Sequence, residues 1–179
     1  VLMGILSRRI SDIKLPPGGV ARALIAQLRE QGQEVIDLTI GEPDFATPEH
    51  ICHAAYAAIN RGDTHYSPAQ GKPKLREALA QKAALQWEID IAPAQVVVSN
   101  GAKQVIANAL AATLDEGDEV IIPAPYWTSY PEMTRLYGGT PVIVNCPVEQ
   151  GYKINPNDLE AAISAKTKWL IMNNPGNPT

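Results

Sequence analysis

Residues 99–103 (SNGAK) have the composition of an anion-binding turn. They follow an apolar run and precede a stretch with helical spacing, so the N–H groups that start the helix would point away from the run. Gly101 permits close approach of the backbone to a ligand, and Lys103 adds a cation. Small residues at such a junction also serve packing alone, so the turn is either a phosphate site or structural. Neither G-x-x-x-x-G-K-[ST] nor G-x-G-x-x-G occurs, which argues against a nucleotide phosphate loop.

Trp127 follows another apolar run, in PAPYWTSY. An aromatic side chain at the end of a strand can stack on a flat heteroaromatic ring, which contributes roughly 0.5–1.5 kcal/mol beyond burial. The alternative is a tryptophan of the core or of an interface. Asn173, Asn174 and Asn177 near the end of the sequence are either ligand contacts or turn formers, and residues 41–44 (GEPD) have the composition of an ordinary turn.

The histidines and cysteines give little indication of a functional site. His50 and His53 form an H-x-x-H pair without a third ligand at metal spacing, so a solvated helix face is expected and no metal site. Tyr66 is either a surface residue or a phenol offered to an anion. Cys52 and Cys146 lack C-x-x-C spacing and are expected to be buried thiols.

Predicted strands and helices alternate along the sequence. Short runs of β-branched residues are followed by longer stretches with helical spacing, which is typical of an α/β fold. The runs are continuous rather than alternating, as in a mostly parallel sheet flanked by helices. Strands are expected at 35–40, 95–100, 119–125, 140–146 and 168–173. Helices are expected at about 20–31, 48–60, 72–87, 102–114, 127–137 and 156–164.

Capping and turn residues support these boundaries. Thr47 before Pro48 and Asn155 before Pro156 both resemble an N-cap followed by proline at the first helical position. Residues 116–118 (EGD) predict a tight turn, and residues 16–19 (PPGG) predict a rigid and then flexible entry.

Ligands of open α/β sheets bind outside the carboxyl ends of the strands. This rule singles out four loops, at 41–44, 99–103, 123–130 and 173–179.

Composition narrows the partners of the chain. Its 179 residues are 45% hydrophobic and 19% charged, a balance typical of a globular protein. The net charge of −4 disfavours nucleic acid and anionic membranes, and no apolar run reaches the roughly 18 residues of a membrane helix. A small-molecule substrate and a cytoplasmic location are therefore expected.

Five ordered segments together resemble the class I aminotransferases, which have the type I fold of pyridoxal-phosphate (PLP) enzymes. The resemblance is nearest to the bacterial aspartate aminotransferase branch. The segments are TIGEPDF (39–45), THYSPAQG (64–71), SNGAKQ (99–104), PAPYWTSYPEM (123–133) and NNPGNPT (173–179). They cover almost the whole chain, which makes the resemblance specific.

The resemblance implies a role for each matching residue. Gly101, Ala102 and Lys103 would hold the phosphate of pyridoxal 5′-phosphate, with Trp127 stacked on its ring. Asn177 would bind the phenolic oxygen of the ring. Three of these five positions, Lys103, Trp127 and Asn177, would also border the substrate.

Two further positions are implied to act at the edges of the site. Gly41 would bind the α-carboxylate of the substrate. Tyr66 would reach the cofactor phosphate of a neighbouring subunit, so a homodimer is implied.

The family exchanges an amine between an amino acid and a 2-oxo acid. It does so with a lysine, a ring-pairing aspartate and a carboxylate-binding arginine, all of which would lie beyond Thr179. No catalytic residue is therefore assigned, and the chain alone is expected to be inactive. It would be an incomplete type I fold, in which 1–46 form an arm with a small-domain segment and 47–179 the first part of the large domain. A second chain carrying the remainder is one explanation.

The sequence leaves two substrate classes and more than one reaction open. Residues 15–19 (LPPGG) lack the hydroxyls that the aspartate branch carries there, although Lys103 is retained. The expected substrate is therefore an acidic amino acid, and the alternative is a broader or aromatic range of amino acids. Other reactions of the same fold, a β-lyase or a synthase, and a non-catalytic dimerising fragment are the alternatives.

Overall fold

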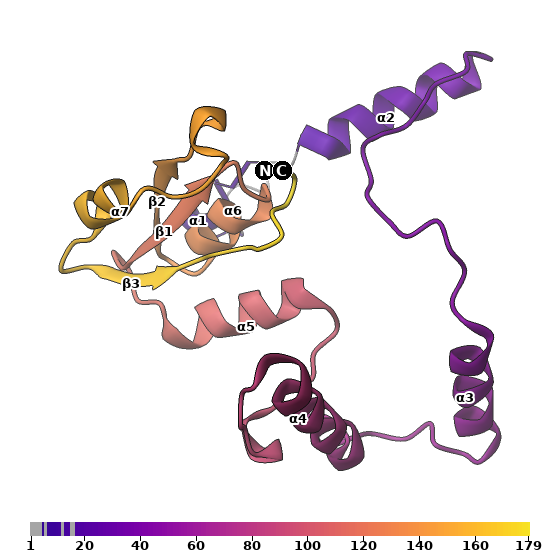
Figure 1. Ribbon diagram of the computed structural model, residues 1–179. Coiled ribbons are helices and arrows are strands. Elements are labelled where there is room, and N and C mark those ends of the chain that lie inside the picture. Colours follow the sequence, from indigo (N-terminus) through magenta and orange to yellow (C-terminus); the bar gives the residue numbers. More distant parts are fainter. Residues whose placement is uncertain (1–4, 6, 12, 15–16) are drawn as a thin grey trace. The chain divides into compact units, whose positions relative to one another are not determined.

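The computed structural model describes residues 5, 7–11, 13, 14 and 17–179 (Figure 1). Leu15 and Pro16, part of the segment expected to lack a substrate hydroxyl, lie outside the described residues. The described chain divides into two compact units, one comprising the part up to Ile40 with Ile106–Thr179, and the other Gly41–Val105. Its helices are α1 (Arg8–Ser11), α2 (Pro17–Glu30), α3 (Glu49–Asn60), α4 (Pro73–Trp87), α5 (Ala102–Thr113), α6 (Ser129–Leu136) and α7 (Pro156–Ala162). Two 3-10 turns, η1 (Pro93–Gln95) and η2 (Val148–Gln150), accompany them.

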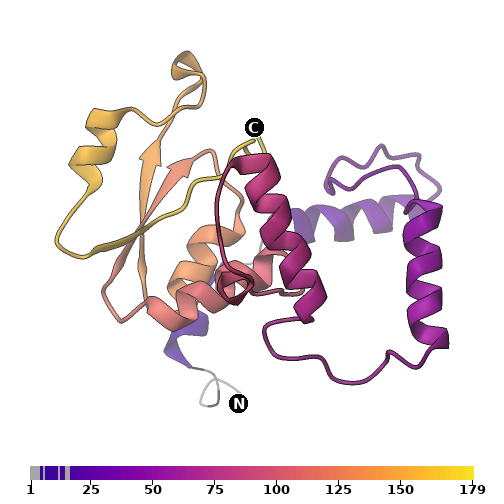
Figure 2. The ribbon, with the colours of Figure 1, turned by 60° about the horizontal axis from the view of Figure 1, so that its bottom comes forward.

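The first unit contains a parallel sheet of three strands in the order β2-β1-β3. The strands are β1 (Glu119–Ala124), β2 (Thr140–Asn145) and β3 (Thr167–Leu170). β1 pairs with β2 in continuous register, whereas its pairing with β3 shifts after Glu119. Parallel neighbours require crossover connections, and α6 and α7 supply them (Figure 2). These findings confirm the predicted α/β class and parallel sheet.

One side of the sheet carries the main core. Val120 and Ile122, two residues apart on β1, point to the same side and are fully buried. They pack with Leu110 of α5 and with Tyr130 and Met133 of α6. Burial of this apolar surface is the main force that holds the helices on the sheet.

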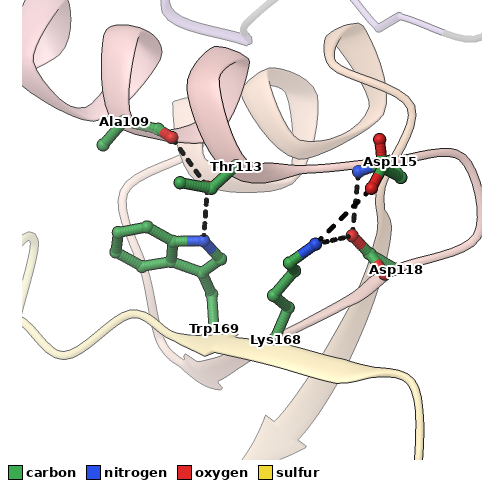
Figure 3. A network of polar contacts seen from close by, with 6 residues as sticks. All are labelled: Ala109, Thr113, Asp115, Asp118, Lys168 and Trp169. Atoms are coloured by element: carbon green, nitrogen blue, oxygen red, sulfur yellow. Dashed lines mark hydrogen bonds and ion pairs between the residues drawn. The ribbon is translucent and has the colours of Figure 1, made fainter.

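Two neighbouring residues of β3 attach it to the α5–β1 connection (Figure 3). Lys168 Nζ donates to Asp118 Oδ2 at 2.9 Å, and that oxygen also accepts the N–H of Asp115 at 2.8 Å. Trp169 Nε1 donates to Thr113 Oγ1 at 2.8 Å, while Thr113 donates to the carbonyl of Ala109. A strand of four residues thus has side-chain bonds in addition to its backbone pairing.

The second unit consists mainly of α3, α4 and η1. An extended loop, residues 61–72, joins α3 to α4 (Figure 2). Ala80 and Ala83 of α4 are buried, and Arg76 of the same helix donates to the carbonyls of Pro93 and Val96. The small buried faces and this arginine hold η1 against α4.

Helix and turn predictions agree with the structure except at two starts. Asn155 caps α7 by accepting the N–H of Asn157, and Gly117 turns with φ +92° as predicted for residues 116–118. The predicted cap at Thr47 is wrong, since Pro48 occupies the N-cap position and makes no side-chain bond. The predicted flexible entry is also wrong, because Pro17 starts α2 and the two glycines continue the helix. Proline is tolerated at the first helical position, since a backbone N–H there would have no partner within the helix.

Two strand predictions are wrong. The runs at 35–40 and 95–100 join no sheet, because a strand requires a ladder of backbone hydrogen bonds and the described residues supply almost none. Gln95 belongs to η1 instead. Val98 donates a single bond, to Gln70. Ile36, Leu38 and Ile40 lie exposed at alternate positions, so they keep the side-chain pattern of a strand without its partner.

The position of Ile122 at the centre of the core yields a stability prediction. Ile122→Ala should lower the free energy of unfolding of the complete polypeptide by about 2–5 kcal/mol, because it leaves a cavity in the packed core. Ile143→Ala on β2 is the matched control, since Ile143 is 44% exposed and its truncation should cost clearly less. Denaturant unfolding measures both, and equal losses would contradict the assignment of the core.

Asp118 yields a pH prediction. The N–H of Asp115, followed by the ammonium of Lys168, lowers the pKa of Asp118 below its ordinary value. The carboxylate therefore stabilises the fold fully above an ordinary pKa of about 3.9, and this contribution is lost as pH falls through the lowered value. The stability difference between the unmodified protein and Asp118→Asn should be largest near neutral pH and shrink below about pH 4. Unfolding midpoints measured across this range test it, and a difference that grows on acidification would contradict it.

Candidate functional site

The predicted anion turn lies immediately before α5. Gly101 has φ +83°, a left-handed conformation that glycine adopts without strain, and the space beside it is open. The N–H of Gly101 itself donates to the carbonyl of Ser99 at 2.9 Å, and the N–H of Asn100 donates to Gln104 Oε1 at 2.6 Å. The N–H of Ala102 finds no acceptor in the described part of the chain. An exposed start of a 12-residue helix with a donor still available fits an anion such as a phosphate.

Trp127 lies between the end of β1 and the start of α6. It is half-buried and packs against the main core, so the alternative of a core tryptophan holds for part of its surface. Its ring meets that of Tyr130 edge to face, with centroids 5.4 Å apart and planes at 86°. Tyr130 belongs to the core, and its carbonyl accepts the hydroxyl of Thr134 at 2.9 Å. The orientation of Trp127 is therefore set by residues of the packed interior.

The asparagine-rich turn follows β3. Asn173, Asn174 and Asn177 are exposed, and all three line a cavity of about 240 Å³. This cavity, called here the carboxyl-edge cavity, is also lined by Tyr126 and Tyr130, which lie on either side of Trp127 in the sequence. Its remaining lining residues are Pro123, Pro125, Gly151, Tyr152, Lys153, Ile171, Gly176 and Thr179. The rule that directed attention to the carboxyl ends of the strands thus agrees with the position of this cavity.

One loop of the cavity was not foreseen from the sequence. Gly151, Tyr152 and Lys153 come from the segment after β2, which was not among the four candidate loops. The signal was available, because the run at 140–146 was predicted as a strand and its carboxyl end must lie at the same edge as that of β1. Tyr126 and Tyr130 were also overlooked beside the more conspicuous Trp127.

The remaining predicted site residues lie in the second unit. Gly41 and Tyr66 are exposed, as are Gly101, Ala102 and Lys103. Trp127 and Asn177 belong to the first unit, with the carboxyl-edge cavity. The seven residues therefore divide between the two units.

The other candidates, the histidines and cysteines, do not line the carboxyl-edge cavity. His50 and His53 are exposed on α3, as predicted for a solvated face, and no group of three or more metal-ligating side chains occurs among the residues described. Cys146 is buried as predicted, whereas Cys52 is only half-buried, because its thiol lies on α3 near the carbonyl of Thr47. No helix within the described ranges is long and apolar enough to cross a membrane.

Comparison with protein families matches residues 33–179 to the model of aminotransferase class I and II. The match contains every predicted site residue.

Among curated proteins, the chain is 47% identical over 177 residues to the probable aspartate/prephenate aminotransferase of Rickettsia conorii. It is also 47% identical over 177 residues to the aspartate/prephenate aminotransferase of Cereibacter sphaeroides. Both alignments cover 99% of this chain but only 44% of the relative. The chain therefore spans less than half the length of the relatives it matches.

Solved structures give the same result. The aspartate aminotransferase of Thermus thermophilus with maleate matches with a TM-score of 0.93 at 44% identity, over 97% of this chain and 46% of that one. The aspartate aminotransferase of Rhizobium meliloti matches with a TM-score of 0.94 at 41% identity, over 97% and 44%. At this identity the fold is the one these aminotransferases share.

The left-handed turn before α5 yields a prediction. Gly101→Ala should destabilise the complete polypeptide by about 1–2 kcal/mol, because a side chain strains a backbone at positive φ even in open space. Gly19→Ala is the matched control, since Gly19 lies inside α2 with equally open space around it. That change should stabilise by about 0.5–1 kcal/mol through helix propensity. Thermal unfolding of both variants tests this, and a shift of the same sign in both would contradict the explanation.

Proposed function

The chain belongs to the class I and II aminotransferase family, and from this premise we propose that the complete protein transfers an amino group between an amino acid and a 2-oxo acid. The observation that carries the proposal is the family match over residues 33–179, which includes all positions assigned to cofactor and substrate. Enzymes of this family depend on pyridoxal 5′-phosphate. The residues present fit that group, because the turn before α5 offers an exposed donor and open space for its phosphate.

The turn of Gly101, Ala102 and Lys103 would bind the phosphate. The N–H of Ala102 points from the start of a helix, whose dipole also favours a negative charge, and Lys103 contributes a positive one. Because the N–H of Gly101 already donates to Ser99, we assign Gly101 the role of opening the backbone rather than donating.

Trp127 and Asn177 would bind the aromatic ring of the cofactor. Trp127 would offer a face held in orientation by Tyr130, and Asn177 would donate from its side-chain amide to an oxygen on the ring. When bound, the cofactor supplies the electron sink for cleavage of a bond at the substrate α-carbon. The chain itself orients that ring and limits its motion.

Gly41 and Tyr66 would act at the periphery of the site. The backbone N–H of Gly41 would bind the α-carboxylate of the substrate. Tyr66, whose side chain is fully exposed, would reach the cofactor phosphate of a second subunit, so the active protein would be a homodimer. We also propose a boundary between 46 and 47, which separates an arm and small-domain segment from the large domain.

An acidic amino acid is the proposed substrate, with Lys103 bordering it. Two relatives carry the name aspartate/prephenate aminotransferase, and a solved relative was crystallised with maleate, a dicarboxylate. We propose the cytoplasm as the location. The residue that holds the cofactor covalently and moves the proton would lie outside residues 1–179, so this segment alone would not turn over.

The test is a steady-state assay of the complete polypeptide with pyridoxal phosphate, 2-oxoglutarate and aspartate, alanine or phenylalanine as amino donor. We expect an aminated acceptor and a new keto acid, with the highest kcat/KM for aspartate. Asn177→Ala should lower kcat/KM by roughly tenfold or more, since about 1.4 kcal/mol of transition-state binding corresponds to tenfold. Asn108→Ala, an exposed asparagine on α5, is the control.

Three outcomes would contradict parts of the proposal. Ammonia and pyruvate without an aminated acceptor would indicate a lyase instead. Turnover by the isolated residues 1–179 would refute the assignment of the catalytic residue to the remainder. A catalytically active protein that stays monomeric at assay concentration would refute the shared site at Tyr66.

A further inference from the structure

Gln104 is hydrogen-bonded to the turn before α5 at two successive residues. It is the third residue of the helix, and its backbone N–H donates to the carbonyl of Gly101 at 3.1 Å. Its side-chain Oε1 accepts the N–H of Asn100 at 2.6 Å. A glutamine at this position of a helix typically reaches back to a backbone donor at the helix start. The side chain and the backbone of Gln104 together therefore hold the conformation of the turn.

The bond from Asn100 to Gln104 affects which backbone donors of the turn remain for a ligand. The N–H of Asn100 is used by Gln104, and that of Gly101 donates to the carbonyl of Ser99 at 2.9 Å. The next N–H along the chain is that of Ala102, which finds no acceptor among the residues described. A glutamine satisfies Asn100 with a neutral oxygen, whereas a glutamate would place a negative charge beside a bound anion.

The segment that enters the turn is anchored independently of α5. The N–H of Val98 donates to the carbonyl of Gln70 at 3.0 Å. Arg76 Nε, from α4, donates to the carbonyl of Val96 at 3.0 Å. Both bonds join residues of the second unit, to which the turn itself also belongs. The side chain of Gln104 thus ties an anchored segment to the first turn of the helix.

We propose that Gln104 is a positioning residue for the cofactor phosphate. By accepting the N–H of Asn100, it holds the turn in the conformation that leaves the Ala102 N–H available to the phosphate. The inference rests on the proposed function and adds to it a residue that acts through the turn rather than by touching the ligand. Without this bond the turn is less ordered, and ordering it on binding lowers the affinity. A bound phosphate can itself accept the N–H of Asn100, which limits the loss.

The test compares binding of pyridoxal 5′-phosphate and of pyridoxal to the complete polypeptide without cofactor. The two probes share a ring and differ by the phosphate, so the ratio of their affinities isolates the contribution of the phosphate. Quenching of tryptophan fluorescence records each affinity. Gln104→Met removes the acceptor at similar side-chain length and should lower the ratio roughly fivefold, with pyridoxal affinity within about twofold. Gln104→Ala, which is favourable in a helix, should lower the ratio equally.

Gln95→Met is the matched control, because Gln95 makes the same kind of bond elsewhere in the second unit. Its Oε1 accepts the N–H of Ala92 at 2.9 Å at the start of η1. Loss of that bond should leave the ratio of affinities within about twofold. Inorganic phosphate, titrated as a competitor of pyridoxal 5′-phosphate, should bind Gln104→Met more weakly and Gln95→Met as well as the unmodified protein.

Each other outcome contradicts a different statement. An unchanged ratio in both Gln104 variants overturns the proposal. An equal loss of affinity for both probes also overturns it, since Gln104 would then only stabilise the fold. If the unmodified protein binds both probes equally, the turn holds no phosphate, and the inference fails together with that part of the proposed function. A ratio that depends on Gln104 in a protein without transamination would refute the proposed reaction alone.

Discussion

β1 is hydrogen-bonded along both of its edges, and this double pairing determines where the other two strands and the loops that follow them lie. Parallel pairing brings the carboxyl ends of β1, β2 and β3 to one edge, so the loops that follow them are neighbours in space although they are far apart in sequence. The same strand presents Val120 and Ile122 to α5 and α6. A single strand therefore fixes both the core and the edge at which ligands of such sheets bind.

Core and site are joined by Tyr130. Its ring packs among the buried residues and meets Trp127, and the residue also lines the carboxyl-edge cavity. Close-packed protein interiors are affected by a volume change of even one methylene group. Substitutions on α6 would therefore alter the contact between Tyr130 and Trp127. The orientation of Trp127 therefore depends on the packing of one core side chain.

Local sequence patterns predicted the helices well, because spacing of apolar residues and proline at the first turn report on a helix by themselves. Asn155 capped its helix as expected, whereas Thr47 did not, since α3 begins at Glu49 and Pro48 occupies the N-cap position. The runs at 35–40 and 95–100 have the composition of strands but lack partners, and pairing is a property of distant segments. The site was predicted where motifs stood out. The loop of Lys153 was missed because it carries no motif, although it follows β2 and lines the same cavity as Asn177.

The exposed row of Ile36, Leu38 and Ile40 has a consequence for synthesis of the protein. Residues 35–40 leave the ribosome early, as an apolar ribbon that joins no sheet in the described structure. Within the described residues its backbone makes only local bonds, from Arg29 to the carbonyl of Val35 and from the N–H of Thr39 to Asp37. Such a ribbon is a template for addition of a strand from any nearby chain, including a second nascent copy. Aggregation of the polypeptide is therefore expected to begin at these residues whenever no other segment covers them.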